Sequence, residues 1–245
     1  MRWSGSGRTV MPRKPVGIVV AMAREIEPLV RGRRAVTVDG LRVFDLESAV
    51  VAAGGIGRAA ARRAAETVLK RYGPTVLVSA GFAGALTATL KVGDVVSALD
   101  VVDAGSGDRF AAVGDAGTIA TVSAVGGATE KRALALKWRA DVVEMEASAV
   151  AAAAQEAGIE FMAIKSISDE LDFEMPPVGS FVDDVGQFET WRFAAWLAVH
   201  PQWWGRARQL SANSRIAALK LSESLQHLID QWSQCVAESK SVKAL

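Results

Sequence analysis

Carboxylates are the side chains of this 245-residue sequence that are best placed to do chemistry. His200 and His227 lie near the C-terminus without a cluster of cysteine, aspartate and glutamate at metal-ligand spacing, so the sequence predicts no metal site. Cys235 is the single cysteine, which argues against both a disulfide and a Cys–His nucleophile. The Gly-x-Ser-x-Gly motif of serine hydrolases does not occur. Any catalysis must therefore rest on carboxylates, and we expect no cofactor.

Two glycine-rich segments follow apolar runs and could bring backbone close to a ligand. Gly55-Ile56-Gly57 follows the run 49–53 and opens a helical stretch, as in a dinucleotide-binding fingerprint. That fingerprint also needs an acidic residue at the end of the next strand, whereas the run 75–80 ends in serine and alanine. This difference argues against nicotinamide binding, and a tight strand-to-helix turn without a ligand is the plain alternative.

The second glycine segment, Gly81-Phe82-Ala83-Gly84, ends another apolar run. Glycine and alanine carry no side chain that would exclude a planar ligand, so the backbone can approach one closely. The turn Leu90-Lys-Val-Gly-Asp94 follows a few residues later. The loop and the turn together indicate a ligand site more specifically than either glycine segment does alone.

Four segments, in order along residues 16–172, resemble the methylthioadenosine/S-adenosylhomocysteine nucleosidases of the nucleoside phosphorylase superfamily. The first is the end of the run 16–21 with Glu25 just after it, and the second comprises the two glycine segments and the turn that follows them. The third is Val143-Glu-Met-Glu-Ala-Ser-Ala149, and the fourth is Ser166-Ile-Ser-Asp169. The resemblance covers about two-thirds of the chain and implies cleavage of the N-glycosidic bond of a purine nucleoside.

The resemblance also implies a role for each residue of these segments. Asp169 would protonate the leaving purine at N7, Ser168 would orient Asp169, and Glu25 would hold the attacking water. Glu146 would accept hydrogen bonds from the ribose hydroxyls, and Met145 would pack against the sugar. The remaining substrate contacts implied by the resemblance are Met22, Gly55, Ile56, Gly81, Phe82, Ala83, Gly84 and Glu144.

Each carboxylate also has a purely structural explanation. The helix dipole favours carboxylates near helix starts, which would account for Glu25, Glu144 and Glu146 without a ligand. Asp169 could be an ordinary N-cap or loop aspartate. An acid and a water-holding carboxylate together nevertheless favour an enzyme over a nucleoside-binding protein without turnover.

The nucleophile could be water or phosphate. Phosphorylases that resemble this chain commonly carry an arginine just before the glycine loop, where Leu77-Val-Ser-Ala80 stands instead. Arg24 and Arg58 remain candidate phosphate ligands, although both also suit solvated helix ends. The sequence favours hydrolysis, with a phosphorylase using phosphate as co-substrate as the alternative.

The substrate that the resemblance implies is a purine nucleoside of adenosine type, with its 5′ substituent open. Residues 104–140 form a shorter segment than in typical methylthioadenosine nucleosidases, and Phe82 stands where those enzymes often have serine. We expect Phe173 or Phe188 to supply the aromatic wall against the base.

The chemistry-bearing segments lie on a regular alternation of elements. Short apolar runs at 16–21, 49–53, 75–80, 95–102, 118–122 and 161–164 predict buried strands. Residues 58–71 and 147–157 predict helices, while 104–116 and 172–186 predict loops. The alternation predicts an α/β fold of three layers, α/β/α, around a mixed, mostly parallel sheet, with a helical C-terminal tail.

One folded domain accounts for nearly the whole chain. We expect residues 1–15 to be a flexible leader, within which Met11 is a candidate natural start. Residues 16–245 should form a single nucleosidase-like domain, with 188–245 as a helical extension of two helices. Ser211 or Asn213 is the predicted N-cap of the second helix.

The extension is rich in tryptophan. We expect Trp191, Trp196, Trp203 and Trp204 to be buried against the core or at a subunit interface. Their mixture with arginines is also typical of segments at a membrane surface. Such a surface would suit a lipid-linked nucleoside as substrate. Hopanoid-associated relatives in the superfamily remove adenine from such a compound, an adenosylated triterpenoid (an adenosylhopane).

Composition narrows the class of partner. The 28 basic and 27 acidic residues nearly cancel, so we expect a small-molecule partner and no nucleic acid. No run reaches the roughly 18 uncharged apolar residues of a membrane span, and the start lacks a signal-peptide pattern. The lone cysteine fits a reducing compartment, so we expect a cytoplasmic protein. The resemblance further implies a homodimer.

Overall fold

The computed structural model describes residues 14–124 and 126–242, with side chains described up to residue 234. Most of the predicted leader, including Met11, lies outside these residues, and so does the Cys235 side chain. Lys14 falls within the predicted leader, and its buried side chain donates from Nζ to Asp45 Oδ1 at 2.6 Å. An ion pair to strand residues therefore ties the chain down before the predicted start of the domain.

The strands of the described chain form one mixed sheet, and helices lie between and after them. The strands are β1 (Val16–Val20), β2 (Val36–Val38), β3 (Leu41–Leu46), β4 (Ala49–Ala53), β5 (Val76–Ala85), β6 (Val95–Ser97), β7 (Asp100–Asp103), β8 (Arg109–Ala111), β9 (Thr118–Thr121), β10 (Val142–Glu144) and β11 (Glu160–Asp169). The α-helices are α1 (Glu27–Val30), α2 (Arg58–Tyr72), α3 (Ala128–Trp138), α4 (Ala147–Ala157), α5 (Thr190–Ala198) and α6 (Trp204–Val242). Three short 3-10 helices are η1 (Ala23–Ile26), η2 (Val178–Phe181) and η3 (Pro201–Trp203).

Strand β5 is the branch point of the sheet. Its first half lies parallel to β1 on one side, and β11 runs parallel to it over nearly its whole length on the other. Near its end, Gly84 and Ala85 pair instead with the antiparallel β10, which continues the sheet through β9, β7 and β8. Because β1, β4, β5 and β11 are parallel, their carboxyl ends meet at one edge of the sheet, where α/β proteins bind ligands.

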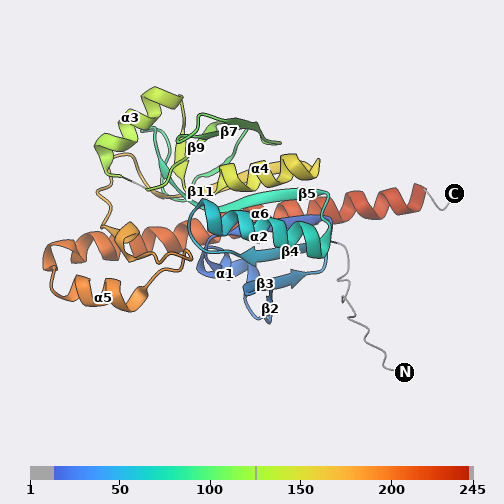
Figure 1. Ribbon diagram of the computed structural model, residues 1–245, viewed down its shortest axis with the longest axis horizontal. Helices are drawn as coiled ribbons and strands as arrows, with labels where there is room; N and C mark the ends of the chain where they lie inside the picture. The colour runs from blue at the N-terminus through green and yellow to red at the C-terminus, as the bar shows by residue number, and fades with distance from the viewer. Residues whose placement is uncertain (1–13, 125, 243–245) are drawn as a thin grey trace, which may run out of the picture.

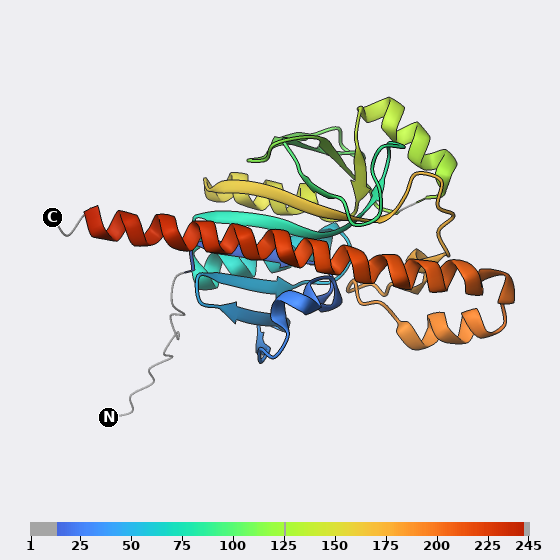
Figure 2. The ribbon, with the colours of Figure 1, turned by 180° about the vertical axis from the view of Figure 1, so that it is seen from behind.

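The sheet lies between two helical layers, as predicted (Figures 1 and 2). Ile18 on β1 packs with Leu221 and Leu225 of α6 on one face. Val19, the next residue, packs with Val68 of α2 on the other face, which α4 also covers. Successive strand residues point to opposite faces, so an all-apolar strand needs a helix on each side.

Two predicted element boundaries are wrong. The run 95–102 is divided between β6 and β7, because Ala98 donates to Ala163 O and Leu99 donates to Gly117 O. The chain thus leaves β11 and joins β9 within two residues. The predicted loop 104–116 contains the short strand β8, which pairs with β7 as a hairpin. The first error arises because strand pairing is set by partners distant in the sequence, and the second because β8 is short and the composition of its segment is typical of a loop.

The tail also departs from the predictions. Its last helix begins at Trp204, so Ser211 and Asn213 lie inside α6 and cap nothing. Trp191 is 73% exposed and Trp204 is 56% exposed, so neither is buried against the core. The reason is that α5 and the first turns of α6 extend beyond the end of the sheet (Figure 2). Within the described residues, no helix has both the length and the apolar character needed to cross a bilayer.

Gly17 allows α2 to lie close to β1, and replacing it tests this packing. A Cβ at Gly17 would lie 2.6 Å from Val68 Cγ1 and 3.0 Å from Pro74 Cγ. We expect Gly17→Ala to lower the free energy of unfolding by about 1–3 kcal/mol, the usual cost of overpacking, as measured by urea denaturation. Gly205→Ala is the matched control, since nothing lies within 4 Å of a Cβ there. An unchanged stability for Gly17→Ala would show that the two layers separate easily.

Candidate active site

A cavity of about 1130 Å³ opens at the carboxyl ends of the parallel strands. Its floor includes the ends of β1, β5, β10 and β11, and its outer wall comes from residues 175–182, α5 and α6. The predicted residues that line it are Met22, Glu25, Ile56, Phe82, Ala83, Gly84, Glu144, Met145, Glu146, Ser168 and Asp169. Segments separated by more than a hundred residues are thus gathered around one space.

Glu25 is held at the floor of the cavity by backbone donors. The amides of Ala21 and Met22 each donate to its Oε2 at 3.1 Å. Gly81 lies against the same carboxylate, and a Cβ there would be 3.3 Å from Oε2. Burial raises the pKa of Glu25, while the Met22 amide and the nearby cations Lys165 and Arg24 oppose the rise. Gly81 therefore serves the site by leaving room for Glu25, although it does not line the cavity.

Glu146 lies two residues after the end of β10 and is the N-cap residue of α4. Its Oε1 accepts a hydrogen bond from the Gly57 amide at 2.7 Å, which joins the first glycine turn to the Glu-Met-Glu segment. Burial, and next the neighbouring Glu144 carboxylate, raise the pKa of Glu146 to about 8. Gly55 stands behind this turn, where a Cβ would meet the backbone oxygens of residues 185 and 186 at 3.1 Å.

Both carboxylate oxygens of Glu144 are bonded to groups of the protein itself. Its Oε2 lies 2.8 Å from Lys165 Nζ, and each of the two side chains is 1% exposed. Its Oε1 accepts a hydrogen bond from Thr121 Oγ1 at 2.6 Å. The Glu146 amide donates to Oε2 at 3.0 Å, and the Ala147 amide donates to both oxygens. We therefore infer that Glu144 positions its neighbours. It also lines the cavity, so its contact with substrate stays a prediction.

Lys165 lies beneath three carboxylates. Burial alone would lower its pKa, but Glu144, Glu146 and Glu25 together raise it. Its Nζ also donates to Ser79 Oγ at 3.1 Å. The ammonium therefore stays charged and offsets the negative charge collected around the cavity. A lysine within the apolar strand was the sequence signal for this group, since such a residue must find a partner.

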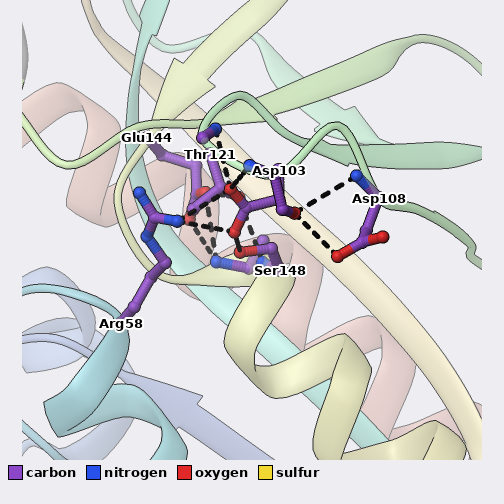
Figure 3. A network of polar contacts seen from close by, with 9 residues as sticks. Arg58, Asp103, Asp108, Thr121, Glu144 and Ser148 are labelled. Atoms are coloured by element: carbon purple, nitrogen blue, oxygen red, sulfur yellow. Dashed lines mark hydrogen bonds and ion pairs between the residues drawn. The ribbon is translucent and has the colours of Figure 1, made fainter.

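Arg58 pairs with Asp103 and is not among the residues that line the cavity. Its Nη1 donates to both oxygens of Asp103 at 2.7 Å, and Ser148 Oγ donates to Asp103 Oδ2 at 2.8 Å (Figure 3). Asp103 and Glu144 thus belong to one network, linked through Ser148 and Thr121. Arg58 does not line the cavity, so its guanidinium is poorly placed to bind phosphate there.

Asp169 ends β11 and is held at both of its oxygens. Ser168 Oγ donates to Oδ1 at 2.8 Å, and Lys131 Nζ forms an ion pair with Oδ2. Lys131 also donates to Glu170 O at 2.8 Å. A Cβ at Gly84 would lie 2.7 Å from Asp169 Oδ2, so glycine is required beside the acid. Sequence analysis missed Lys131, which sits on the mostly exposed helix α3 with no distinguishing pattern.

Phe188 is the aromatic candidate that reaches the cavity. It lines the wall beside Phe193, and the Arg24 guanidinium lies 5.4 Å from its ring centroid. Phe173 does not line the cavity, because it is buried and packs under Arg206, 5.5 Å from its ring centroid. The expectation for Phe173 is therefore wrong, while Phe188 and Phe82 remain available to a base.

The phosphorylase superfamily is the family whose sequence pattern matches this chain, over residues 15–117 and 111–191. The chain belongs to the phosphorylase superfamily. This match covers well over half of the sequence and includes all four segments that carry the predicted site. The superfamily assignment confirms the resemblance that these segments indicated.

Solved structures share the fold of this superfamily member. A futalosine hydrolase mutant of Helicobacter pylori strain 26695 aligns with a TM-score of 0.68 and 19% identity, covering 89% of this chain and 99% of its own. The 5′-methylthioadenosine/S-adenosylhomocysteine nucleosidase of Helicobacter pylori, with butyl-thio-DADMe-Immucillin-A, gives the same four values. The 5′-methylthioadenosine nucleosidase of Arabidopsis thaliana aligns with a TM-score of 0.68 and 18% identity over 91% of this chain and 97% of its own.

Breaking the buried Lys165–Glu144 pair should be strongly destabilising. Lys165→Met leaves a buried carboxylate without its cation, and we expect the free energy of unfolding to fall by about 3–5 kcal/mol. Adding Glu144→Gln should recover part of the loss, because the unpaired charge is then removed. The control is Lys220→Met, whose exposed pair with Glu223 should contribute less than about 1 kcal/mol. Equal losses for Lys165→Met and Lys220→Met in urea denaturation would contradict this assignment.

Proposed function

We propose that this protein hydrolyses the N-glycosidic bond of a purine nucleoside and releases the base. The observation that carries the proposal is the set of three carboxylates, Glu25, Glu146 and Asp169, that line one cavity. Each is held by a different set of donors, so the three can take different parts in the reaction. Binding a nucleoside without turnover would not need this set.

The base side of the reaction is assigned to Asp169. Asp169 forms an ion pair with Lys131, so it must first take up a proton from solvent when the substrate binds. As the bond between the sugar and the purine breaks, its electron pair moves to the purine, and this proton passes from Asp169 to N7. Ser168 Oγ orients the carboxyl group through its hydrogen bond to Oδ1. The Lys131 ammonium stabilises the carboxylate that remains after the proton has left.

The sugar side is assigned to Glu146 and Glu25. The ribose hydroxyls donate to the Glu146 carboxylate, and these bonds strengthen as positive charge develops on the sugar. Glu25 holds a water molecule and accepts one of its protons while the water oxygen bonds to the anomeric carbon. Met145, which lines the cavity, supplies apolar contact to the sugar.

Water is favoured over phosphate as the nucleophile because Arg58 is already paired with Asp103. A phosphate dianion needs several cationic donors close together. Arg24 and Arg215 do line the cavity, and they keep a phosphate-dependent phosphorylase as the second candidate for the nucleophile.

The size of the cavity favours a substrate with a large apolar 5′ substituent as a second candidate class. Typical small-molecule sites enclose about 300–1,000 Å³, and this cavity is larger. Apolar residues line part of it, beside the charged Arg31 and Arg215; they are Met175, Pro176, Val178, Leu210 and Leu219. A lipid-linked adenosine, of adenosylhopane type, would fill this space where methylthioadenosine would leave much of it to water.

Replacement of the proposed acid tests the reaction. We expect Asp169→Asn to lower kcat for base release by about 10²–10⁴-fold, because the general acid is lost. Release of base would be measured for methylthioadenosine, S-adenosylhomocysteine, adenosine and lipid-linked adenosine, with and without phosphate. Asp172→Asn is the matched control, since this nearby aspartate is exposed and does not line the cavity.

The outcomes of this panel separate the candidates. Phosphate-independent release that Asp169→Asn removes would support the hydrolase. Release that requires phosphate would replace the hydrolase by the phosphorylase. Nucleoside binding without release from any compound would contradict both and indicate a binding protein.

The raised pKa of Glu146 predicts the pH dependence. The carboxylate accepts hydrogen bonds from ribose hydroxyls, and with a pKa of about 8 it accumulates as pH rises through that value. We therefore expect kcat/KM to rise between about pH 6 and pH 9, since this quantity reports groups of the free enzyme. Glu146→Gln should lower kcat/KM and flatten the rise. A flat wild-type profile would count against a protonated Glu146 in the free enzyme.

A further inference from the structure

Residues 190–219 comprise α5, η3 and the first turns of α6, and we call this segment the arm. Its helix α5 has two apolar faces. The inner face carries Phe193 and Trp196, whose rings pack against Phe181 at centroid distances of 5.3 and 5.7 Å. The outer face is uncharged and exposed, and its members are Trp191, Ala194, Ala195, Ala198 and Val199. A helix that is apolar on both faces is normally covered on both.

Large apolar side chains are exposed at both ends of α5 and at the start of α6. Trp191 is 73% exposed, and Val199 is 72% exposed at the end of the same helix. Trp204, which begins α6, is 56% exposed, and its indole nitrogen donates to Leu197 O at 2.7 Å. Trp191 near the start of α5, and Val199 and Trp204 at the connection between α5 and α6, are thus large apolar side chains exposed to solvent. Tryptophan is enriched where an apolar phase meets water.

The charge of the arm has one sign. Its thirty residues contain Arg192, Arg206, Arg208 and Arg215 and no aspartate or glutamate. Arg206 and Arg208 are exposed beside Trp204, whereas Arg192 forms an ion pair with Glu189 just outside the arm. Since the whole chain carries a net charge of only +1, this positive charge is concentrated in the arm.

The arm extends beyond the sheet and also forms part of the cavity wall. Figures 1 and 2 show α5 and the first turns of α6 reaching past the strands on the side opposite the C-terminus. Phe193, Ala207, Leu210 and Ser214 face the cavity from the same segment. Whatever the outer face contacts therefore lies next to the cavity.

We propose that the arm docks on an anionic lipid bilayer, with Trp191, Val199 and Trp204 entering the interfacial region and the arginines contacting lipid phosphates. Anionic lipid complements both the apolar outer face and the uniform positive charge. Symmetric pairing of two arms would bring like charges together, which disfavours a second copy of this chain as the occupant. Docking would place the cavity beside the membrane surface, so that a substrate could enter from the bilayer.

The test is flotation of the full chain with lipid vesicles, which needs no activity. We expect binding to vesicles of phosphatidylcholine with phosphatidylglycerol, weaker binding to phosphatidylcholine alone, and weaker binding at high salt. Arg206→Gln with Arg208→Gln should lower the partition coefficient about 10- to 30-fold, on the scale of about 1 kcal/mol per basic residue. Trp191→Ser with Trp204→Ser should weaken binding even at low salt.

Matched controls separate the arm from general charge and folding. Arg33→Gln with Arg34→Gln removes the same charge from an exposed loop of the body and should leave binding almost unchanged. Circular dichroism and thermal unfolding would show that every variant is folded. Absence of binding to the anionic vesicles at low salt would overturn the proposal, as would binding that the arm variants leave unchanged. A dimer seen by sedimentation without vesicles, lost in the tryptophan variant, together with no vesicle binding, would assign the face to a second copy instead.

Discussion

The buried ion pair between Lys165 and Glu144 is the interaction on which the rest of the site depends. Removing two charges from water costs several kcal/mol for each ion, so such a pair is tolerated only when every polar atom has a partner. Here Ser79, Thr121 and two backbone amides supply the partners. They come from β5, β9 and the start of α4, so satisfying the pair fixes these elements relative to β11. Asp169 and Glu146 extend from the elements fixed in this way.

The same constraint explains the glycines around the cavity. A second buried lysine, Lys131, pairs with Asp169, and both ends of this pair lie against Gly84. Gly81, three residues earlier on β5, lies in the same way against the Glu25 carboxylate. A side chain at either position would displace a charged group from its donors. The glycine loop therefore serves the carboxylates as well as any ligand that approaches it.

Helix α6 links the core, the cavity and the surface. Its middle part buries Leu221 and Leu225 against the sheet, and one turn earlier Ala218 lies at the cavity wall. Its first turns belong to the arm, whose side chains face the cavity on one side and solvent on the other. A single rigid helix thus connects the strands that hold the catalytic candidates to the exposed tryptophans.

The sequence by itself determined the α/β class, most strands and helices, and the four segments around the cavity. Strand and helix periodicity is a local property and gave the elements. The order of short motifs carried the resemblance to the nucleosidases, and that resemblance singled out Glu25, Glu146 and Asp169 before their geometry was known. Only the tertiary structure decided the partners of these groups. No local sequence feature distinguishes Lys131 from a solvated lysine or predicts that Arg58 pairs with Asp103. Nor does the sequence show that the run 95–102 divides into two strands with different partners. The sequence predicted burial for Trp191, whereas the structure leaves it 73% exposed. Burial depends on which elements come to lie over a residue, and long-range packing sets that arrangement.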